Sequence, residues 1–427
     1  MLSAGRSTGR IIAIVGGGAY VPALCEALAR APIPGRLHIR LSARRGDRLA
    51  IIAAHAGARV TALRPDDRWT VEAARDRREA IDGADDVVLL VRVGGTAARA
   101  HDERFPRELG LVGDEGLGPG GIANAYRTIP VLAELAGVVR RGAPHARVWN
   151  LVAPLGATTR VLLDEGVDAV GVCELPAVTL ERLLAAASAR PDDVRPRVRP
   201  RVRPDDVRFE YAGLNHLGWF WDVRAGDVDV LARAAEAGLV DAPTLDRFGA
   251  APLKYFYEVF APAAASRLGL VRDPERAATL ATVSDRLLER YRGNGDGEPG
   301  PLRPTPWFDR ALAPMIAACA GGPPFAGFAN VRNAGGAIAP SLPPGAVVET
   351  ATSIAGGVLV PRPWGTPPPA VERFLQQAAR AEALAFAAAR AQSPALVRRA
   401  IEALPLEVPR AALDGLVARA IAPIVET

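Results

Sequence analysis

The segment covering residues 10–30 constrains the fold of this chain more than any other stretch. An apolar run at 11–15 leads into three consecutive glycines, Gly16, Gly17 and Gly18, and an amphipathic stretch follows them. A buried strand, a glycine turn and a helix in this order are typical of the first unit of an α/β fold. Such a turn lets a pyrophosphate approach the backbone, and the helix N-terminus stabilises its charge.

Two interpretations of this turn stay open on the residues alone. The spacing G-x-G-x-x-G is broken, because Val21 stands where the last glycine would be. The segment is therefore either a plain strand–helix turn or a dinucleotide site. We favour the dinucleotide site, with Gly16, Gly17, Gly18 and Tyr20 as cofactor-binding residues.

Further short apolar segments indicate how the first half of the chain is built. Strands are expected at 37–41, 60–71, 85–93, 147–152 and 167–172, and a helix at 122–140. Alternating strands and helices predict a Rossmann-like, doubly wound parallel sheet over residues 1–176. The mixed pattern of residues 177–427 predicts an α+β domain that serves substrate binding or oligomerisation. The Pro/Arg-rich stretch at 190–207 is expected to be a surface loop.

The composition of the chain argues against two functional classes, nucleic-acid-binding proteins and membrane proteins. No basic stripe interleaved with aromatic residues is present, which argues against nucleic-acid binding. The apolar run at 11–15 is too short for a membrane span or a signal-peptide core. The three cysteines, Cys25, Cys173 and Cys319, are far apart and odd in number, which fits a reducing compartment. We therefore expect a cytoplasmic protein without a membrane or nucleic-acid partner.

Cys173 and His216 each lie in a short motif, Gly-Val-Cys-Glu-Leu-Pro and Gly-Leu-Asn-His-Leu-Gly. A thiolate and an imidazole together form a nitrogen–sulfur site for a divalent transition metal, and two ligands leave positions open for substrate. Taken singly, the cysteine would be read as a small buried hydrophobe and the histidine as a hydrogen-bonded core residue.

The end of the second predicted strand bears on the choice of dinucleotide. An NAD site places a carboxylate there to hold the ribose hydroxyls, but this chain has Ala43 followed by Arg44 and Arg45. Arginine at this point suits the 2′-phosphate of NADP. NAD and NADP both stay open, with Arg44 as a cofactor-binding residue, and surface coverage is the alternative role for the two arginines.

The stretch 91–130 is rich in glycine and charged residues and follows the buried strand at 85–93. Together with the glycine turn, the motifs 171–176 and 213–217, and the later 330–333 and 348–349, it resembles glycoside hydrolase family 4. That resemblance covers nearly the whole chain and implies a glycosidase of carbohydrate metabolism that depends on NAD and a metal, many members acting on 6-phospho-glycosides.

The resemblance also implies a mechanism that departs from the two-carboxylate rule of glycosidases. Hydride transfer from C3 of the sugar to the nicotinamide acidifies the C2 proton, a tyrosine removes that proton, the metal stabilises the enediolate, and the leaving group is eliminated. Water then adds and the ketone is reduced again. A nearby cation can lower the pKa of the phenol and so make it a base.

Site residues follow from the family pattern. By resemblance, Cys173 and His216 match the metal ligands, with Mn²⁺ expected. Tyr255 matches the catalytic base, Tyr257 competes for that role, and Lys254 is placed to hold the phenolate. Glu115 matches a residue near the cofactor, and the residues expected at the substrate are Arg92, Asn150, Glu174 and Asn215.

Three departures from the pattern concern the substrate and the cofactor. The family's second asparagine after the fifth strand is Ala153, and its asparagine beside the cysteine is Glu174. Three roles stay open for Glu174: a third metal ligand, an acceptor for sugar hydroxyls, or a residue that points away from the site. The acidic ribose ligand is missing at Ala43. A glycoside other than a 6-phospho-glycoside therefore stays open.

Two other functions compete with glycoside cleavage. One is an NAD(P)-dependent sugar dehydrogenase that stops after C3 oxidation, and the other is a catalytically impaired homologue that only binds a nucleotide or sugar. The resemblance also implies self-association as a homodimer or homotetramer, with a small-molecule glycoside as substrate.

Overall fold

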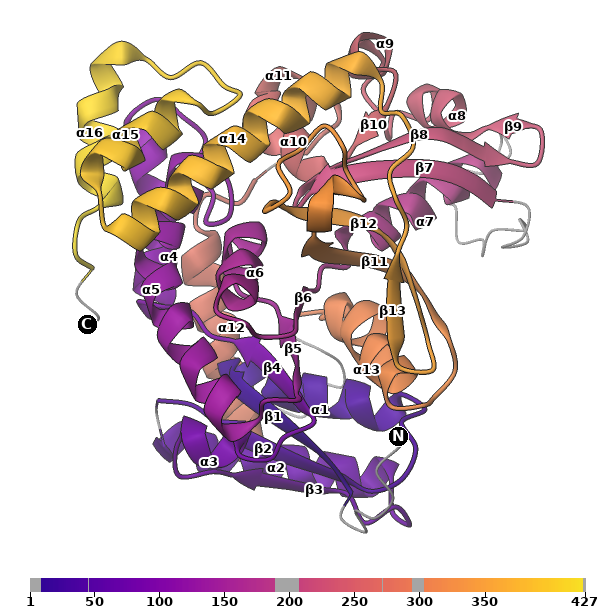
Figure 1. Ribbon diagram of the computed structural model, residues 1–427, viewed down its shortest axis with the longest axis vertical. Coiled ribbons are helices and arrows are strands. Elements are labelled where there is room, and N and C mark those ends of the chain that lie inside the picture. Colours follow the sequence, from indigo (N-terminus) through magenta and orange to yellow (C-terminus); the bar gives the residue numbers. More distant parts are fainter. Residues whose placement is uncertain (1–8, 45, 189–206, 271, 294–302, 425–427) are drawn as a thin grey trace.

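The computed structural model describes residues 9–44, 46–188, 207–270, 272–293 and 303–424 (Figure 1). Within these residues the strands form one 13-stranded sheet, parallel at one end and antiparallel at the other. The segment expected to be a surface loop at 190–207 lies outside the described residues except for Val207, which begins a strand.

The parallel end of the sheet has the strand order β3-β2-β1-β4-β5-β6, which is the order of a Rossmann fold. Its strands are β1 (Arg10–Gly16), β2 (Leu37–Ser42), β3 (Thr70–Ala73), β4 (Asp86–Leu90), β5 (Arg147–Asn150) and β6 (Ala169–Gly171). The helices that accompany them are α1 (Val21–Arg30), α2 (Gly46–Leu63), α3 (Arg77–Ile81), α4 (Gly95–Glu108), α5 (Gly118–Gly142), α6 (Leu155–Asp164) and α7 (Leu175–Ser188). The predicted fold class is confirmed here.

The continuous apolar run of β1 has a simple explanation. Ile12 and Ile14 belong to one hydrophobic core, whereas Ala13 and Val15 belong to another. Successive side chains of a strand point to opposite faces, so β1 is covered on both faces, as parallel strands usually are. The expected strand at 60–71 was misplaced, because α2 extends to Leu63 and the strand is β3, an edge strand with mostly exposed residues.

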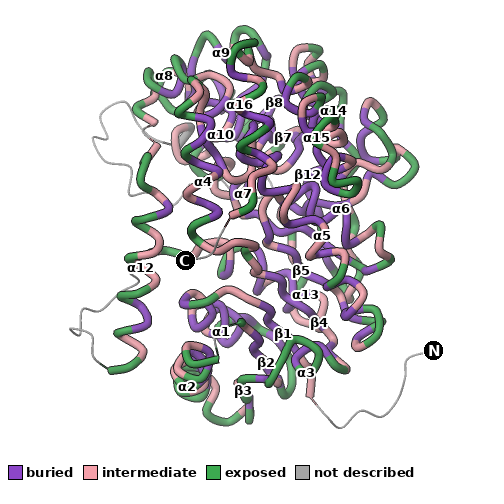
Figure 2. Tube along the Cα trace, turned by 90° about the vertical axis from the view of Figure 1, so that its left-hand side faces the viewer, coloured by how far each residue is buried: buried purple, intermediate pink, exposed green. Residues whose placement is uncertain are grey.

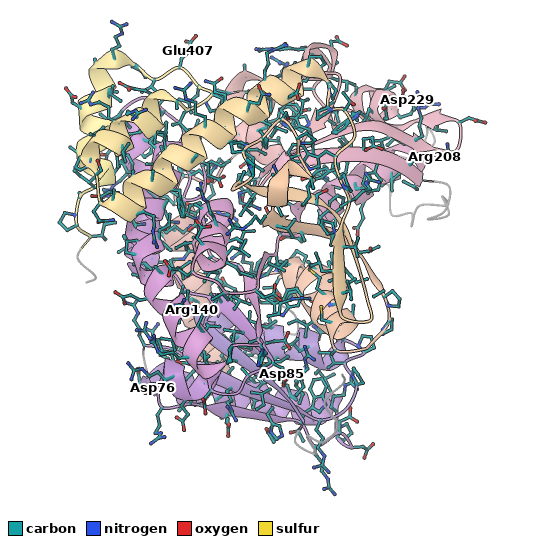
Figure 3. All side chains as sticks on the ribbon, viewed as in Figure 1. Asp76, Asp85, Arg140, Arg208, Asp229 and Glu407 are labelled. Atoms are coloured by element: carbon teal, nitrogen blue, oxygen red, sulfur yellow. The ribbon has the colours of Figure 1, made fainter. Side chains whose placement is uncertain are left out.

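The antiparallel end is built from later parts of the chain. Its strands are β7 (Val207–Leu214), β8 (Leu217–Ala225), β9 (Val228–Asp229), β10 (Ala251–Pro252), β11 (Phe325–Arg332), β12 (Val347–Ala355) and β13 (Val358–Pro361). Its helices are α8 (Val230–Glu236), α9 (Ala242–Phe248), α10 (Lys254–Phe260), α11 (Pro262–Arg267), α12 (Arg276–Tyr291), α13 (Ala313–Cys319), α14 (Pro369–Ala391), α15 (Pro394–Glu402) and α16 (Leu413–Ala420). Short helical turns lie at Gly18–Tyr20, Phe308–Leu312, Ala334–Gly336 and Arg410–Ala412. Arg208 and Asp229, labelled in Figure 3, lie at the outer end of this part, far from Asp76 at the start of α3.

The two ends of the sheet meet where β6 pairs with β11, through Gly171 and Asn330. The long helix α14 also connects them, since it contacts α5 and α6 as well as β7 and α9 (Figure 1). One hydrophobic core contains residues of both ends, among them Ile12 and Trp219. The predicted division into two domains, residues 1–176 and 177–427, stays a prediction. In the structure these two segments share one sheet and one hydrophobic core.

Burial follows this arrangement (Figure 2). The strands at the centre are buried, while α12 at one edge is mostly exposed or half-buried, with Ala277, Leu287 and Leu288 as its buried residues. No helix in the described part of the chain combines the length and the apolar character needed to cross a bilayer.

The junction generates a prediction about Gly171. A Cβ at this position would lie 2.7 Å from Thr159 Oγ1 and 2.9 Å from Asn330 Cβ. We expect Gly171→Ala to lower the free energy of unfolding by about 1–3 kcal/mol, because the side chain overpacks a tight site. Gly57→Ala in α2 is the control, since its nearest neighbour would be Val71 at 3.9 Å. Equal stability of the two variants in urea unfolding would contradict a tight junction.

Candidate active site

A cavity of about 1210 Å³ contains nearly all the predicted site residues. It lies beyond the carboxyl ends of β1, β2, β4, β5 and β6, where open α/β sheets bind ligands. The β7–β8 turn, α10 and α12 contribute further residues to its wall. The predicted residues that line it are Gly16, Gly17, Gly18, Tyr20, Arg44, Arg92, Glu115, Cys173, Glu174, Asn215, His216 and Tyr255.

Asn150 is the exception and corrects the prediction of a substrate ligand. It is fully buried, donates to Thr158 Oγ1 at 2.9 Å and Thr159 Oγ1 at 3.0 Å, and accepts from the Val152 amide at 3.1 Å. Its amide group is thereby occupied in fixing the turn between β5 and α6. The side chain does not line the cavity, so its part in the site is to hold that turn.

The glycine turn after β1 fits a dinucleotide. Gly16, Gly17 and Gly18 all have positive φ, at 91°, 89° and 52°, a region that favours glycine. A Cβ at Gly16 would lie 2.8 Å from the Leu90 backbone, whereas at Gly18 nothing lies within 4 Å. The turn is thus pressed against β4 on one side and open on the other, which leaves room for a pyrophosphate.

Tyr20 adds an independent indication of a ligand at this turn. Its hydroxyl is buried and has no hydrogen-bond partner among the described residues. An unsatisfied buried hydroxyl costs about 1–3 kcal/mol. A polar ligand in the cavity would remove that cost, which fits the prediction that Tyr20 binds the cofactor.

His216 lies in the two-residue turn that joins β7 to β8, between Leu214 and Leu217. Its φ of 68° is uncommon for a residue other than glycine, and such strain concentrates at functional sites. Burial lowers the pKa of His216 to about 4 even though Asp114 opposes the shift. The imidazole is therefore neutral at physiological pH and can offer a lone pair to a metal.

Cys173 follows β6 and lies against the residue that precedes His216. Its thiol is buried, and a hydrogen bond with the Asn215 side chain holds it. Burial raises the pKa of Cys173, and the carboxylates of Glu349 and Glu174 raise it further. A divalent cation would supply the positive charge that stabilises the thiolate here. Among the described residues no group of three or more His, Cys, Asp or Glu could hold a metal, so this pair would leave positions open.

A buried carboxylate supports the turn that carries Asn215 and His216. Glu349 is fully buried in β12 and accepts hydrogen bonds from Tyr211 at 2.6 Å, Asn330 at 2.9 Å and Asn215 at 3.3 Å. Burial raises the pKa of Glu349 to about 7, although these three donors oppose the shift. Glu349 therefore links the β6–β11 junction to the turn that carries Asn215 and His216.

Tyr255 stacks on His216, with ring centroids 4.1 Å apart and an interplanar angle of 1°. Lys254 Nζ lies 4.9 Å from the ring centroid, as the sequence suggested for a cation beside the phenol. In the chain by itself, burial and Asp114 raise the pKa of Tyr255 more than the nearby arginines lower it. Tyr257 does not line the cavity, and its hydroxyl accepts the Asp241 amide at 3.3 Å, so the structure favours Tyr255 over Tyr257.

Glu115 is held between two guanidinium groups. It forms ion pairs with Arg92 and with Arg99, the latter at 2.8 Å, and Arg99 also pairs with Glu103 at 2.8 Å. Glu103 and Arg99 lie on α4, which follows β4 in the chain. In the sheet, β4 is the neighbour of β1. The pairs fix the Arg92 and Glu115 side chains in the cavity wall.

The two substitutions at the substrate end both face the cavity. The Ala153 carbonyl accepts from Asn124 at 3.0 Å, so its backbone stays anchored without the asparagine side chain. Burial raises the pKa of Glu174 above its usual value, although Lys254 and Arg303 partly oppose this shift. Glu174 therefore places a carboxyl group beside Cys173 in the region where substrate would lie.

Two residues that the sequence motifs did not single out, Asp114 and Arg272, also organise this site. Asp114 is buried, pairs with Arg272 and accepts from the amides of Gly116 at 2.7 Å and Leu117 at 2.9 Å. Burial alone would raise the pKa of Asp114, but Arg272 and His216 lower it below its usual value. Its place beside Glu115 in a glycine-rich loop was the available signal. Arg272 lies in a loop outside any recognisable motif, so the sequence contains no signal of its role.

Comparison with known families agrees with this geometry. The model described as "Family 4 glycosyl hydrolase" matches residues 11–188, and that of the "Family 4 glycosyl hydrolase C-terminal domain" matches residues 211–406. The chain belongs to glycosyl hydrolase family 4. The resemblance inferred from the sequence motifs is thereby confirmed.

Curated relatives are similar to part of the chain. A "Probable 6-phospho-beta-glucosidase" of Bacillus subtilis (strain 168) is 37% identical over 164 residues, which are 38% of this chain and 34% of that protein. An alpha-galacturonidase of the same strain is 31% identical over 169 residues, 38% of this chain and 36% of that protein. The chain thus spans about a third of the length of these relatives.

Solved structures of the family share the fold over nearly the whole chain. The 6-phospho-beta glucosidase from Thermotoga maritima, determined with NAD and glucose-6-phosphate, superposes with a TM-score of 0.79 at 23% identity, covering 96% of this chain and 97% of that one. A 6-phospho-alpha-glucosidase from gut microorganisms, in complex with NAD and Mn²⁺, gives a TM-score of 0.76 at 20% identity over 97% and 98%. These likenesses establish the family 4 fold for both ends of the sheet.

The buried carboxylate yields a prediction about pH. The folded-state pKa of Glu349, about 7, exceeds its ordinary 4.5, so its contribution to stability is full below pH 4.5 and is lost as pH rises through 7. We expect Glu349→Gln to remove this loss. The difference in free energy of unfolding, Glu349→Gln minus wild type, should therefore increase by about 2–3 kcal/mol from pH 5 to pH 8.

Urea unfolding at both pH values, with a chelator present, measures this difference. Glu407→Gln is the control, because Glu407 is exposed at the surface (Figure 3). A gap between wild type and Glu349→Gln that stays constant with pH would contradict the raised pKa.

Proposed function

We propose that this chain is a glycosidase that cleaves a glycoside through transient oxidation at C3 of the sugar, with a nicotinamide dinucleotide and a divalent cation, most simply Mn²⁺. One observation carries the proposal. A single cavity joins the glycine turn of Gly16–Gly18 to Cys173, His216 and Tyr255. The relatives named for glycosidase activity, and the solved family members determined with NAD, Mn²⁺ or glucose-6-phosphate, support it.

The residues for both cofactors fit their chemistry. Gly16–Gly18 and Tyr20 would hold the dinucleotide, and Cys173 and His216 would hold the cation. When bound, the nicotinamide takes up and returns a hydride and the cation polarises the sugar hydroxyl oxygens. Glu349 and Asn215 position the thiol, and the strained β7–β8 turn fixes the imidazole.

Tyr255 is the proposed base for the C2 proton. Its ring lies flat against His216, which brings the phenol oxygen to the same part of the cavity as the metal-ligand pair. Oxidation at C3 makes the C2 proton acidic, so a positioned phenol can remove it before the leaving group departs. Lys254, held by Glu258 at 3.7 Å, keeps a positive charge beside that phenol.

The polar groups of the cavity also bear on the substrate. Arg92, Lys254, Arg276 and Arg303 line it, and cationic side chains suit a phosphorylated sugar. Glu174 adds a carboxyl group that can accept from sugar hydroxyls. We propose a glycoside substrate, with a 6-phosphate as the form to test first.

The test is turnover in D₂O with NAD or NADP, Mn²⁺ and a panel of phosphorylated and plain aryl glycosides. We expect release of the aglycone with deuterium at C2 of the sugar, without net reduction of the cofactor. Cofactor reduction without aglycone release would favour a sugar dehydrogenase. Absence of both would favour a homologue that only binds, in which Ala153 and Glu174 have removed the activity.

Tyr255→Phe tests the base. We expect aglycone release and C2 exchange to fall by about 100-fold or more, because the group that takes the proton is gone. Tyr257→Phe is the matched control two residues away, and its activity should stay near that of the wild type, since Tyr257 points outside the cavity. Normal C2 exchange in Tyr255→Phe would overturn the assignment.

Cys173→Ser tests the metal ligand. Since a neutral hydroxyl replaces the thiolate, we expect the affinity for Mn²⁺, measured by titration of the free ion signal in electron paramagnetic resonance, to fall at least about tenfold. Cys319→Ser is the control, because Cys319 is half-buried outside the cavity. Unchanged Mn²⁺ binding and activity in Cys173→Ser would contradict this role.

We also propose that the chain works in the cytoplasm as a homodimer or homotetramer. Its three cysteines are free, which suits a reducing compartment, and the family resemblance implies self-association. Light scattering of the purified chain would measure the oligomeric state directly.

A further inference from the structure

The cavity continues past the glycine turn to the carboxyl ends of β2 and β3. Ser42, Ala43 and Arg44 line it at the end of β2. In Rossmann folds this position lies beside the ribose of the adenosine, where a carboxylate accepts from the 2′- and 3′-hydroxyls of NAD. Here the position is Ala43, so the chain offers no carboxylate at the end of β2 itself.

Three arginines from separate segments line this end of the cavity. Arg44 follows β2, Arg48 lies in the first turn of α2, and Arg77 is the first residue of α3, which follows β3. Strands β2 and β3 are neighbours in the sheet, paired from His38–Thr70 to Leu41–Ala73. Their carboxyl ends, and the residues after them, therefore meet in space although Arg44 and Arg77 are far apart in sequence.

We propose that this group of arginines binds the 2′-phosphate of NADP, so that the chain prefers NADP(H) to NAD(H). The inference rests on the proposed function in that it assumes a nicotinamide cofactor at the glycine turn. A phosphate monoester carries about two negative charges, which arginines meet with paired hydrogen bonds. Ser42 adds a hydroxyl, and the N-terminal end of the 18-residue α2 favours an anion nearby.

Carboxylates also lie near these arginines, namely Asp47 in the first turn of α2, Asp76 at the N-cap of α3, and Asp285. Asp285 of α12 also lines the cavity, 3.8 Å from Arg48, with 67% of its side chain exposed. It comes from the helix that covers the cavity edge and not from the end of β2. Its contact with Arg48 positions that guanidinium at the cavity wall.

Direct binding to the full chain, without substrate or metal, tests the proposal. We expect fluorescence titration to give a dissociation constant at least about tenfold lower for NADPH than for NADH. The fragment 2′,5′-ADP, which lacks the nicotinamide, should compete with NADPH much better than 5′-AMP does. Because these measurements use no turnover, they are independent of glycosidase activity.

Variants locate the phosphate site. Arg44→Gln and Arg77→Gln should each weaken NADPH binding about tenfold and change NADH binding less than about twofold. Ala43→Asp should reverse the preference, since it restores the ribose acceptor and repels the phosphate. Arg78→Gln is the matched control, because Arg78 is the next residue of α3 but does not line this cavity.

The outcomes separate this inference from the proposed function. Equal or tighter binding of NADH, or an Arg78→Gln variant as weak as Arg77→Gln, overturns the 2′-phosphate site and leaves the glycosidase proposal standing. Absence of binding for both dinucleotides overturns the cofactor on which the proposed function depends. Thermal unfolding of each variant shows that a lost affinity is not a lost fold.

Discussion

The close approach of β6 and β11 at Gly171 and Asn330 is the constraint on which the site depends. Gly171 has no side chain, and this absence lets β11 pair antiparallel beside the last parallel strand. Cys173 comes two residues after Gly171, just beyond the end of β6, and Asn330 of β11 donates to Glu349 of β12. A larger residue at 171 would separate the cysteine from the turn that carries His216.

A network of buried hydrogen bonds around Glu349 connects this junction to the turn that carries His216 and to the buried side chain of Tyr211. Glu349 gathers Tyr211, Asn330 and Asn215, so one buried carboxylate fixes three elements at once. Such a network is costly unless every member is paired. Its member Asn215 precedes His216 and contacts Cys173, so the network holds the two proposed metal ligands, and a site with two protein ligands would need both held rigidly.

The sequence predicted the parallel half well, because its signals are local. The apolar run of β1 reflects its burial on both faces. The three glycines reflect a turn in which the backbone has positive φ. The family motifs then located Cys173, His216 and Tyr255. What the sequence could not show was which polar residue faces the cavity: Asn150 reads as a ligand but its amide is consumed by Thr158 and Thr159. Residues joined across the fold, such as Arg272 with Asp114, leave no periodic trace in the chain.

The continuous sheet has a consequence for how the molecule can move. Dinucleotide enzymes whose two halves are separate bodies can close around a ligand by rotating one half about a hinge. Here such a rotation would break the β-ladder at the β6–β11 and β7–β12 pairs and shear the shared core. We therefore expect access to the cavity to depend on elements at its rim, such as α12 at the molecular edge, which contributes lining residues (Figure 2). The rate of cofactor exchange would then follow the stability of that helix and not the stability of the sheet.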